Sequence, residues 1–371
     1  MLFQKLMGKG PASVISPSAP KTLWGWGNNT DGQLGLGDII NRSSPVQTGS
    51  LTTWSAVAIG NHSLATKSDG TLWAWGVNTH GQHGLGDVAS RSSPVQVGAL
   101  ATWSKITSGP AHSLSLKTDG TLWVWGRSYS GSLGLGDIVS RSSPVQLGTL
   151  ATWSQITAGG YHSITLKTDG TLWAWGRNEN SGQLGLADTV SRSSPVQVGT
   201  LTTWTMIAGG SSHSLATKSD GTLWAWGSSL RGQLGLSDVV DRSSPVQVGT
   251  LATWSQFSGS LNSSLAVKTD GTLWAWGQNT NGILGLDDIM HRSSPVQVGT
   301  LATWSQVAGG SSFSLAIKTD GTLWAWGYNA DGRLGLGNVA YRSSPVQVGT
   351  LATWTTIAKV PQASHSLALR A

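Results

Sequence analysis

The stretch Lys167–Gly176, which reads KTDGTLWAWG, decides the fold because close copies of it recur along almost the whole chain. There are seven copies, and each contributes a Trp pair and a later single Trp. The pairs are Trp24/Trp26, Trp73/Trp75, Trp123/Trp125, Trp173/Trp175, Trp224/Trp226, Trp274/Trp276 and Trp324/Trp326. The single residues, which complete the 21 tryptophans, are Trp54, Trp103, Trp153, Trp204, Trp254, Trp304 and Trp354. A period of about fifty residues indicates a repeated supersecondary unit whose copies bury their apolar faces by stacking on one another.

The composition fits one repeat domain rather than the two or three that 371 residues would otherwise suggest. Only 11% of the residues are charged, 50 are Gly and none is Cys. This balance favours short strands joined by many turns, and it excludes disulfide and thiol chemistry. We predict a leader over residues 1–20 and a single domain over residues 21–371.

Each repeat is expected to form four short strands bounded by Gly, Asn, Asp, Ser and Pro. In one repeat these strands are Ser154–Ala158, Ser163–Lys167, Thr171–Gly176 and Pro195–Val198. Asp169-Gly170 predicts a tight hairpin between the second and third strands, because Gly accepts a positive φ without penalty. The third strand is apolar on both faces, so its sheet must be sandwiched, with large Trp side chains opposite small Ala of a neighbouring copy.

Seven sandwiched four-stranded sheets predict an all-β fold, a seven-bladed β-propeller. The first copy begins in a third strand, Thr22–Gly27, without the hairpin that precedes the other six, and the chain ends in a second strand, Ser366–Arg370. One closing blade is therefore expected to combine N- and C-terminal strands, which leaves no exposed sheet edge. The strand that reads Ile/Val-Ala-Gly-Gly is expected to be innermost, because small residues suit the crowded axis.

The copies share the pattern HSLAxKxDGTLWAWG, followed by GQLGLGD. This pattern resembles the repeat of the regulator of chromosome condensation family over about residues 21–371, and the resemblance implies a seven-bladed propeller with a split closing blade. Members of that family include a nucleotide-exchange factor for the GTPase Ran and a bacterial β-lactamase inhibitor, so the resemblance does not specify a partner. The exchange factor's β-wedge requires a long insertion in one blade, whereas the spacing between repeats here changes by only one or two residues.

Two classes of loop differ between the copies, whereas the other two classes hardly vary. The segment after each WxWG reads NNTDG, VNTHG, RSYSG, RNENSG, SSLRG, QNTNG or YNADG, and the loops between first and second strands also diverge. In an antiparallel meander both classes open on the same face of the disc. Aromatic, Asn and Arg side chains on loops of a rigid scaffold are typical of protein-binding surfaces. The alternative, neutral drift, is less favoured because the constant loops are exposed too.

We interpret the divergent loops as a partner-binding face. The residues assigned to it are His80, Arg127, Tyr129, Tyr161, Arg177, Asn178, Arg231, Phe313, Tyr328 and Tyr341.

Other candidate sites are weaker. His62, His112, His162, His213 and His365 occupy equivalent positions that could form a partial metal ring, but hydrogen bonding within each blade is the preferred interpretation. The Asp of each Gly-x-Asp and the Arg four residues later suggest a salt bridge or Asx turn that braces the long loop, and Asn338 can replace only the hydrogen bonding. A catalytic centre would require a Ser/His/Asp set or a carboxylate pair that occurs only once, and the sequence contains none. We therefore expect neither an enzyme nor a metal or other cofactor.

The net charge of +6 is spread over the leader and scattered loops without forming the basic stripe of a nucleic-acid binder. No secretory signal or membrane-spanning stretch is evident, so neither export by that route nor membrane insertion is expected. The leader is interpreted as an anchoring arm through Leu2, Phe3, Lys5 and Lys9.

The favoured function is a non-enzymatic interaction protein that binds a protein or surface glycan. The preferred setting is a phage virion, as a capsid-decoration, tail or adhesion protein held to other virion proteins by the leader. The alternative is a cytoplasmic regulator of a small GTPase or a protein inhibitor of an enzyme.

Overall fold

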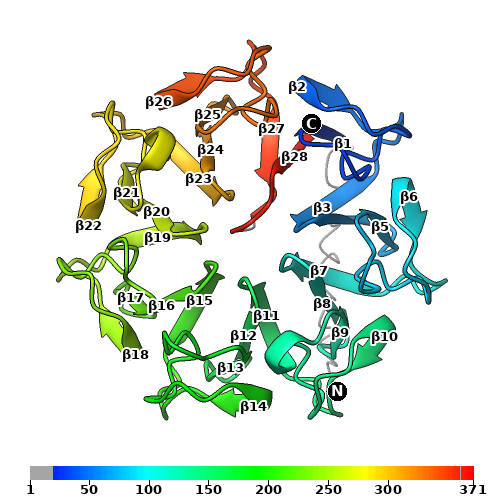
Figure 1. Ribbon diagram of the computed structural model, residues 1–371, viewed down its shortest axis with the longest axis horizontal. Helices are drawn as coiled ribbons and strands as arrows, with labels where there is room; N and C mark the ends of the chain where they lie inside the picture. The colour runs from blue at the N-terminus through cyan, green and yellow to red at the C-terminus, as the bar shows by residue number, and fades with distance from the viewer. Residues whose placement is uncertain (1–19, 360) are drawn as a thin grey trace, which may run out of the picture.

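The computed structural model describes residues 20–359 and 361–371. Seven four-stranded antiparallel sheets stand in a ring around a central channel (Figure 1). The predicted all-β, seven-bladed propeller is confirmed. We number the blades in chain order, with the blade that joins the two ends of the chain as blade 7.

The first three blades follow directly along the chain. Blade 1 contains β3 (Trp54–Ile59), β4 (His62–Lys67), β5 (Leu72–Gly76) and β6 (Arg91–Gln96). Blade 2 contains β7 (Trp103–Ser108), β8 (His112–Lys117), β9 (Leu122–Gly126) and β10 (Arg141–Gln146). Blade 3 contains β11 (Trp153–Ala158), β12 (His162–Lys167), β13 (Leu172–Gly176) and β14 (Arg192–Gln197).

The next three blades repeat this order. Blade 4 contains β15 (Trp204–Gly209), β16 (His213–Lys218), β17 (Leu223–Gly227) and β18 (Arg242–Gln247). Blade 5 contains β19 (Trp254–Gly259), β20 (Ser263–Lys268), β21 (Leu273–Gly277) and β22 (Arg292–Gln297). Blade 6 contains β23 (Trp304–Gly309), β24 (Phe313–Lys318), β25 (Leu323–Gly327) and β26 (Arg342–Gln347).

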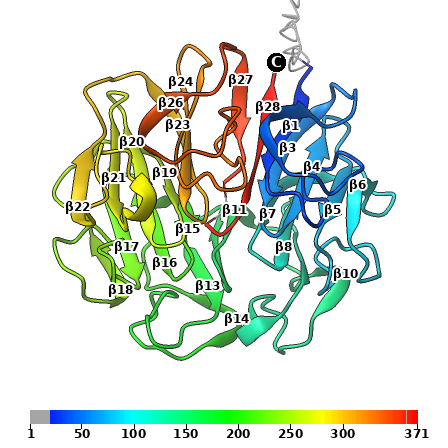
Figure 2. The same ribbon diagram turned by 45° about the horizontal axis from the view of Figure 1, so that its top comes forward.

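Blade 7 is assembled from both ends of the described chain. Its strand order is β2 (Arg42–Gln47), β1 (Thr22–Gly27), β28 (His365–Arg370) and β27 (Trp354–Ile357). The pairing of β1 with β28 runs without a break from Thr22 opposite Arg370 to Gly27 opposite His365. The predicted split of the closing blade is therefore confirmed (Figure 2).

The innermost strand of each blade is the one predicted from its small residues. These strands line a channel cavity of about 280 Å³, to which Ile106, Thr157, Ile207 and Ser258 contribute. The outer strands begin earlier than expected. For example, β14 starts at Arg192, whereas the strand was expected to start at Pro195. Pro is tolerated there since the outer strand is a sheet edge that needs no continuous ladder of donors.

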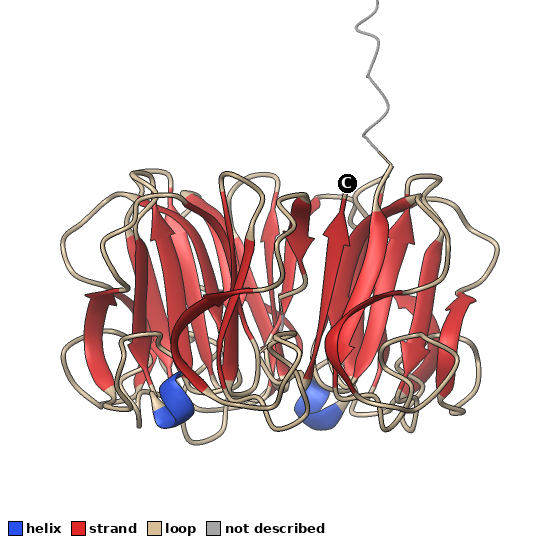
Figure 3. Ribbon diagram, turned by 90° about the horizontal axis from the view of Figure 1, so that it is seen from above, coloured by secondary structure: helices blue, strands red, loops and turns tan. Residues whose placement is uncertain are grey.

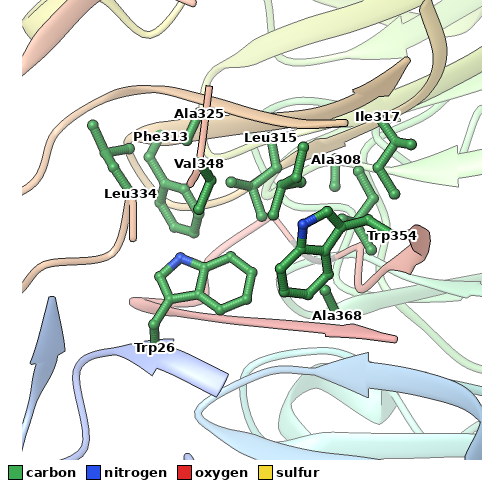
Figure 4. Packing of buried hydrophobic residues seen from close by; sticks show 12 residues of the cluster. Trp26, Ala308, Phe313, Leu315, Ile317, Ala325, Leu334, Val348, Trp354 and Ala368 are labelled. Carbon is green, nitrogen blue, oxygen red and sulfur yellow. The ribbon is translucent and has the colours of Figure 1, made fainter. Parts of the chain in front are cut away.

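The core lies between the blades. Trp26 and Trp354 of blade 7 pack against Phe313, Leu315 and Ala325 of blade 6 (Figure 4). The expected pairing of large Trp with small Ala across neighbouring copies is thus confirmed.

The two residues of each Trp pair differ in burial, although both pack against the core. Trp175 is completely buried, and its indole N–H donates to the Ser132 carbonyl of blade 2 at 3.0 Å. Trp173 is partly exposed, and the Nζ atom of Lys167 lies 3.7 Å from its ring centroid. The first Trp of a pair therefore forms a cation–π contact at the surface.

Two short 3-10 turns, η1 (Tyr129–Gly131) and η2 (Thr280–Gly282), are the only helical elements of the described residues. None of the helices found there is long and apolar enough to cross a membrane.

Candidate functional site

The two divergent loop classes open on one face of the disc, as predicted. In blade 3, His162 pairs with Gly176, and Gly176 pairs with Arg192, so both loops lie at the same end of the sheet. The Arg177 N–H donates to the Tyr161 carbonyl at 2.9 Å, which ties the two loops together. We call this surface the variable face; it is the lower face in Figure 3, where η1 and η2 lie.

The constant loops and both ends of the described chain lie on the opposite face. Lys21 bridges to Thr53, and the Ala371 N–H donates to the Thr353 carbonyl at 3.0 Å. The first described residues therefore lie on the side away from the variable face. The assigned anchoring residues Leu2, Phe3, Lys5 and Lys9 lie outside the described residues.

A first aromatic cluster crosses from blade 2 to blade 3. The rings of Tyr129 and Tyr161 have centroids 5.0 Å apart, and the guanidinium carbon of Arg127 lies 5.1 Å from the Tyr129 centroid. Tyr129 is 41% exposed. Partial burial and the positive charge of nearby Arg127 lower the pKa of His80. The structure therefore brings three of the assigned residues, Arg127, Tyr129 and Tyr161, into contact.

A second cluster lies on blade 6. The rings of Tyr328 and Tyr341 have centroids 4.7 Å apart. The guanidinium of Arg333 lies 4.7 Å from the Tyr328 centroid and forms an ion pair with Asp331. Arg333 is almost completely buried, so it supports the tyrosines from below, while Tyr341 remains 47% exposed. Blades 4 and 5 separate this cluster from the first one on one side of the ring.

Two assigned residues do not present side chains on the surface, so their assignment is corrected. Phe313 is 2% exposed and belongs to the core between blades 6 and 7 (Figure 4). Asn178 is completely buried, and its amide donates to Asp188 while its oxygen accepts from the Leu184 N–H at 2.8 Å. Arg177 is half-buried and Arg231 is exposed. Among the described residues, neither forms a cation–π contact with the tyrosines of either cluster.

The centre of the variable face is crossed by the loop between β27 and β28. Lys359 donates to the Phe257 carbonyl of blade 5 at 3.3 Å, and Gln362 donates to Ser211 Oγ of blade 4. The Ser311 N–H of blade 6 donates to the Ala363 carbonyl at 3.1 Å. One loop of blade 7 thus contacts three other blades across the mouth of the channel.

The equivalent histidines join blades to one another, which corrects the expectation of bonds within each blade. Each Nε2 atom lies 2.7–3.3 Å from the Ser Oγ of the next blade: His62–Ser113, His112–Ser163, His162–Ser214, His213–Ser264 and His365–Ser63. Each of these Ser hydroxyls also donates to a backbone carbonyl, as Ser113 does to that of Gln82, so Nε2 carries the proton. In the described part of the chain, no group of three or more His, Asp or Glu side chains is placed to hold a metal.

The predicted Asp–Arg braces are present in six blades. In blade 2, Arg141 Nη2 lies 2.6 Å from Asp137 Oδ2, and Asp137 Oδ1 accepts from the Val139 N–H. These two contacts hold the pKa of Asp137 below its ordinary value, with the backbone bond as the larger cause. Both the salt bridge and the Asx turn are therefore confirmed.

A ring of exposed aliphatic side chains was missed by the sequence analysis. These residues lie one or two positions after the Asp of each brace, or after Asn338 in blade 6, at the variable-face end of the outer strands, and they are 57–71% exposed. They are Ile39, Ile40, Val88, Ile138, Val139, Val190, Val239, Val240, Ile289, Met290 and Val339. The recurrence of apolar residues in this loop was the signal available in the sequence. The exposed side chains add apolar contact area to the variable face.

Comparison with family models identifies the repeat. The model described as RCC1-like domain matches residues 151–371, and the model of the regulator of chromosome condensation (RCC1) repeat matches residues 22–65, 69–116 and 119–166. The chain belongs to the RCC1-like family. A search of curated proteins found no matching sequence.

RCC1-like propellers of known structure share the fold at low sequence identity. Prp20p from Saccharomyces cerevisiae has 21% identity and a TM-score of 0.83, and the match covers 95% of this chain and 92% of that one. Human WBSCR16 has 22% identity and a TM-score of 0.83, with 94% and 98% covered. At this identity the likeness establishes the fold alone.

Proposed function

We propose that this RCC1-like propeller is a non-enzymatic binding protein that holds a protein partner on its variable face. The observation that carries the proposal is the pair of tyrosine clusters, each with an arginine over or beneath a ring, on loops of a scaffold whose other loops are nearly identical. Tyr and Arg are enriched among the residues that dominate binding energy, because they combine large apolar area with polar groups.

The relatives support the regulatory alternative more than the virion setting. Yeast Prp20p is described with its binding to Gsp1p and histones, and in a second structure it is bound to Kap60. These partners belong to Prp20p, a protein that shares the fold of this chain. None of the comparisons favours a virion component or a glycan ligand, so we propose a regulatory protein partner for this chain.

The first prediction concerns Tyr129→Ala combined with Tyr161→Ala. Immobilised wild-type and variant propellers would be used to capture proteins from a cell lysate, and each captured protein would then be purified and titrated. We expect its affinity to fall at least about tenfold in the variant, because truncating a central aromatic residue costs about 2 kcal/mol or more.

A matched control is Leu251→Ala, which removes an exposed side chain from the constant face. It should leave the affinity unchanged. Equal affinities of the wild type, the Tyr129/Tyr161 variant and a Tyr328→Ala/Tyr341→Ala variant would exclude the variable face as the binding surface.

A further inference from the structure

One arginine of the repeated framework lacks the acidic partner that its six equivalents have. Each outer strand begins with an Arg, and in six blades its Nη2 atom lies 2.5–2.7 Å from an Asp carboxylate four residues earlier. These pairs are Arg42–Asp38, Arg91–Asp87, Arg141–Asp137, Arg192–Asp188, Arg242–Asp238 and Arg292–Asp288. In the same six blades Nη1 also donates to the carbonyl two residues earlier.

Blade 6 departs from this arrangement because Asn338 replaces the Asp. The Asn338 side chain keeps the Asx turn, since its oxygen accepts from the Ala340 N–H at 3.0 Å while its amide donates to the Leu336 carbonyl. The loop therefore keeps its shape without a negative charge. Among the described residues, the guanidinium of Arg342 forms a single hydrogen bond, from Nη1 to the Tyr341 carbonyl at 3.0 Å, and no ion pair.

The unpaired guanidinium borders a hollow between blades 6 and 7. The hollow has a volume of about 400 Å³, and its lining includes Arg342, Asn338, Leu336, Trp24 and Pro45, together with residues of the neighbouring strands and loops. No Asp or Glu of the described chain lines it. A similar hollow between blades 3 and 4 contains Arg192, but that arginine is already held by Asp188.

The hollow adjoins the second tyrosine cluster. Arg342 directly follows Tyr341, whose ring packs on Tyr328 at 4.7 Å between centroids. A partner seated on the variable face at blade 6 could therefore extend over the rim into this hollow. Three framework positions are changed in this one blade: Asn338 replaces Asp, Arg333 replaces Gln and Phe313 replaces His.

We propose that the hollow between blades 6 and 7 binds a side-chain carboxylate, Asp or Glu, of the protein partner, with Arg342 as its counter-ion. A planar guanidinium offers two parallel donors to a carboxylate, which makes this pair geometrically specific. The six equivalent arginines show that the framework presents this group to a carboxylate whenever one is supplied. The apolar lining from Trp24, Leu336 and Pro45 accommodates an apolar residue next to the acidic one. The proposal rests on the proposed function.

Restoring the consensus acid tests the proposal directly. Asn338→Asp would supply an internal carboxylate to Arg342 without altering the shape of the loop. Hexaglutamate and hexaglutamine peptides would be titrated at low ionic strength, with the Arg342 side-chain Nε–H signal followed by NMR and assigned with Arg342→Gln. We expect hexaglutamate, but not hexaglutamine, to shift this signal, and its apparent affinity to fall at least tenfold in Asn338→Asp.

A reciprocal control is Asp238→Asn in blade 4, which removes the acid beside Arg242 but leaves Arg342 unchanged. It should not weaken the response at Arg342. Equal hexaglutamate affinity in the wild type and Asn338→Asp would overturn the proposal, as would a uniform shift of all arginine signals. A stronger response to inorganic phosphate than to hexaglutamate would overturn the assignment to a carboxylate.

The outcome can be separated from that of the proposed function. If the affinity for a natural partner fell in Tyr129→Ala/Tyr161→Ala but stayed unchanged in Asn338→Asp, the result would support the variable face as the binding surface and exclude the proposed role of Arg342. Both proposals would fail if the affinity for the partner stayed unchanged in Tyr129→Ala/Tyr161→Ala, in Tyr328→Ala/Tyr341→Ala and in Asn338→Asp.

Discussion

At the scale of single residues, His83 is the framework position least suited to its surroundings. It is completely buried in blade 1, and neither ring nitrogen has a hydrogen-bond partner in the described part of the chain. The other six blades carry a fully buried Leu at this position, such as Leu133. Burial, followed by repulsion from Arg91, lowers the pKa of His83 to about 4, and the nearby backbone of Trp75 and Gly76 opposes this shift only in part.

We therefore expect His83→Leu to raise the free energy of unfolding by about 1–3 kcal/mol, because it removes an unsatisfied buried polar group. Urea unfolding at pH 7 measures the effect. The reverse change at the equivalent position, Leu133→His, should be destabilising by a similar amount or more. A decrease in stability for His83→Leu would show that His83 has a partner that these contacts do not reveal.

Single residues also show why the site was predictable only in part. The tyrosines were placed correctly on the variable face because successive strands of an antiparallel meander run in opposite directions. The first and third loops of each blade therefore open on the same face. Asn178 and Phe313 lie on loops or strand ends at the same face, but their side chains fold inward to a backbone amide or a neighbouring blade. Position in a loop does not determine the direction of a side chain, so their burial could not be inferred.

At the scale of elements, β28 holds blade 7 together because it is the only strand that joins β27 to β1. Its Leu367 and Leu369 are completely buried against blade 1. The hairpin missing before Thr22 was enough to predict this arrangement. The bonds between histidine and the next blade were not predictable, since identical repeats do not reveal which copy a side chain contacts.

Deletion of residues 366–371 should therefore abolish cooperative folding or lower the melting temperature by more than about 10 °C. Loss of each buried Leu costs about 2–5 kcal/mol, and 1 kcal/mol corresponds to a few degrees. Thermal unfolding followed by Trp fluorescence measures this. Deletion of Ala371 alone, which leaves β28 intact, is the control. A cooperative transition at the wild-type temperature would mean that blade 7 does not close the ring.

At the scale of the whole molecule, the five histidine–serine contacts make stability depend on pH. Burial is the main cause that lowers the pKa of His112 and His213 to about 4 and those of His162 and His365 to about 3; the pKa of His62 is also well below its usual value. These residues are neutral in the folded ring but bind a proton near pH 6.5 when unfolded. Their stabilising contribution is therefore complete above pH 6.5 and is lost as the pH falls toward 4.

Urea unfolding at several values between pH 7 and pH 4.5 should show this loss, at about 1.4 kcal/mol per pH unit for each histidine that titrates only on unfolding. The braced Asp residues cannot account for this loss, because their pKa values in the folded protein are lowered from 3.8 and their effect on stability therefore lies below this pH window. His213→Phe, which copies the residue at the equivalent position of blade 6, should reduce the slope by one proton. A slope unchanged by that substitution, or no slope at all, would contradict the neutral, buried state.

The closing blade also determines how the ring would respond to a mechanical load. Thr22 and Arg370 face each other at one end of the antiparallel β1–β28 pair. A force that pulled the two ends of the chain apart would act on the hydrogen bonds of this pair one after another, starting at that end, instead of on all of them together. The ring would then open at blade 7 by sequential loss of these hydrogen bonds, which requires a lower force than breaking all of them at once by shear. The contacts between the other blades would still be intact.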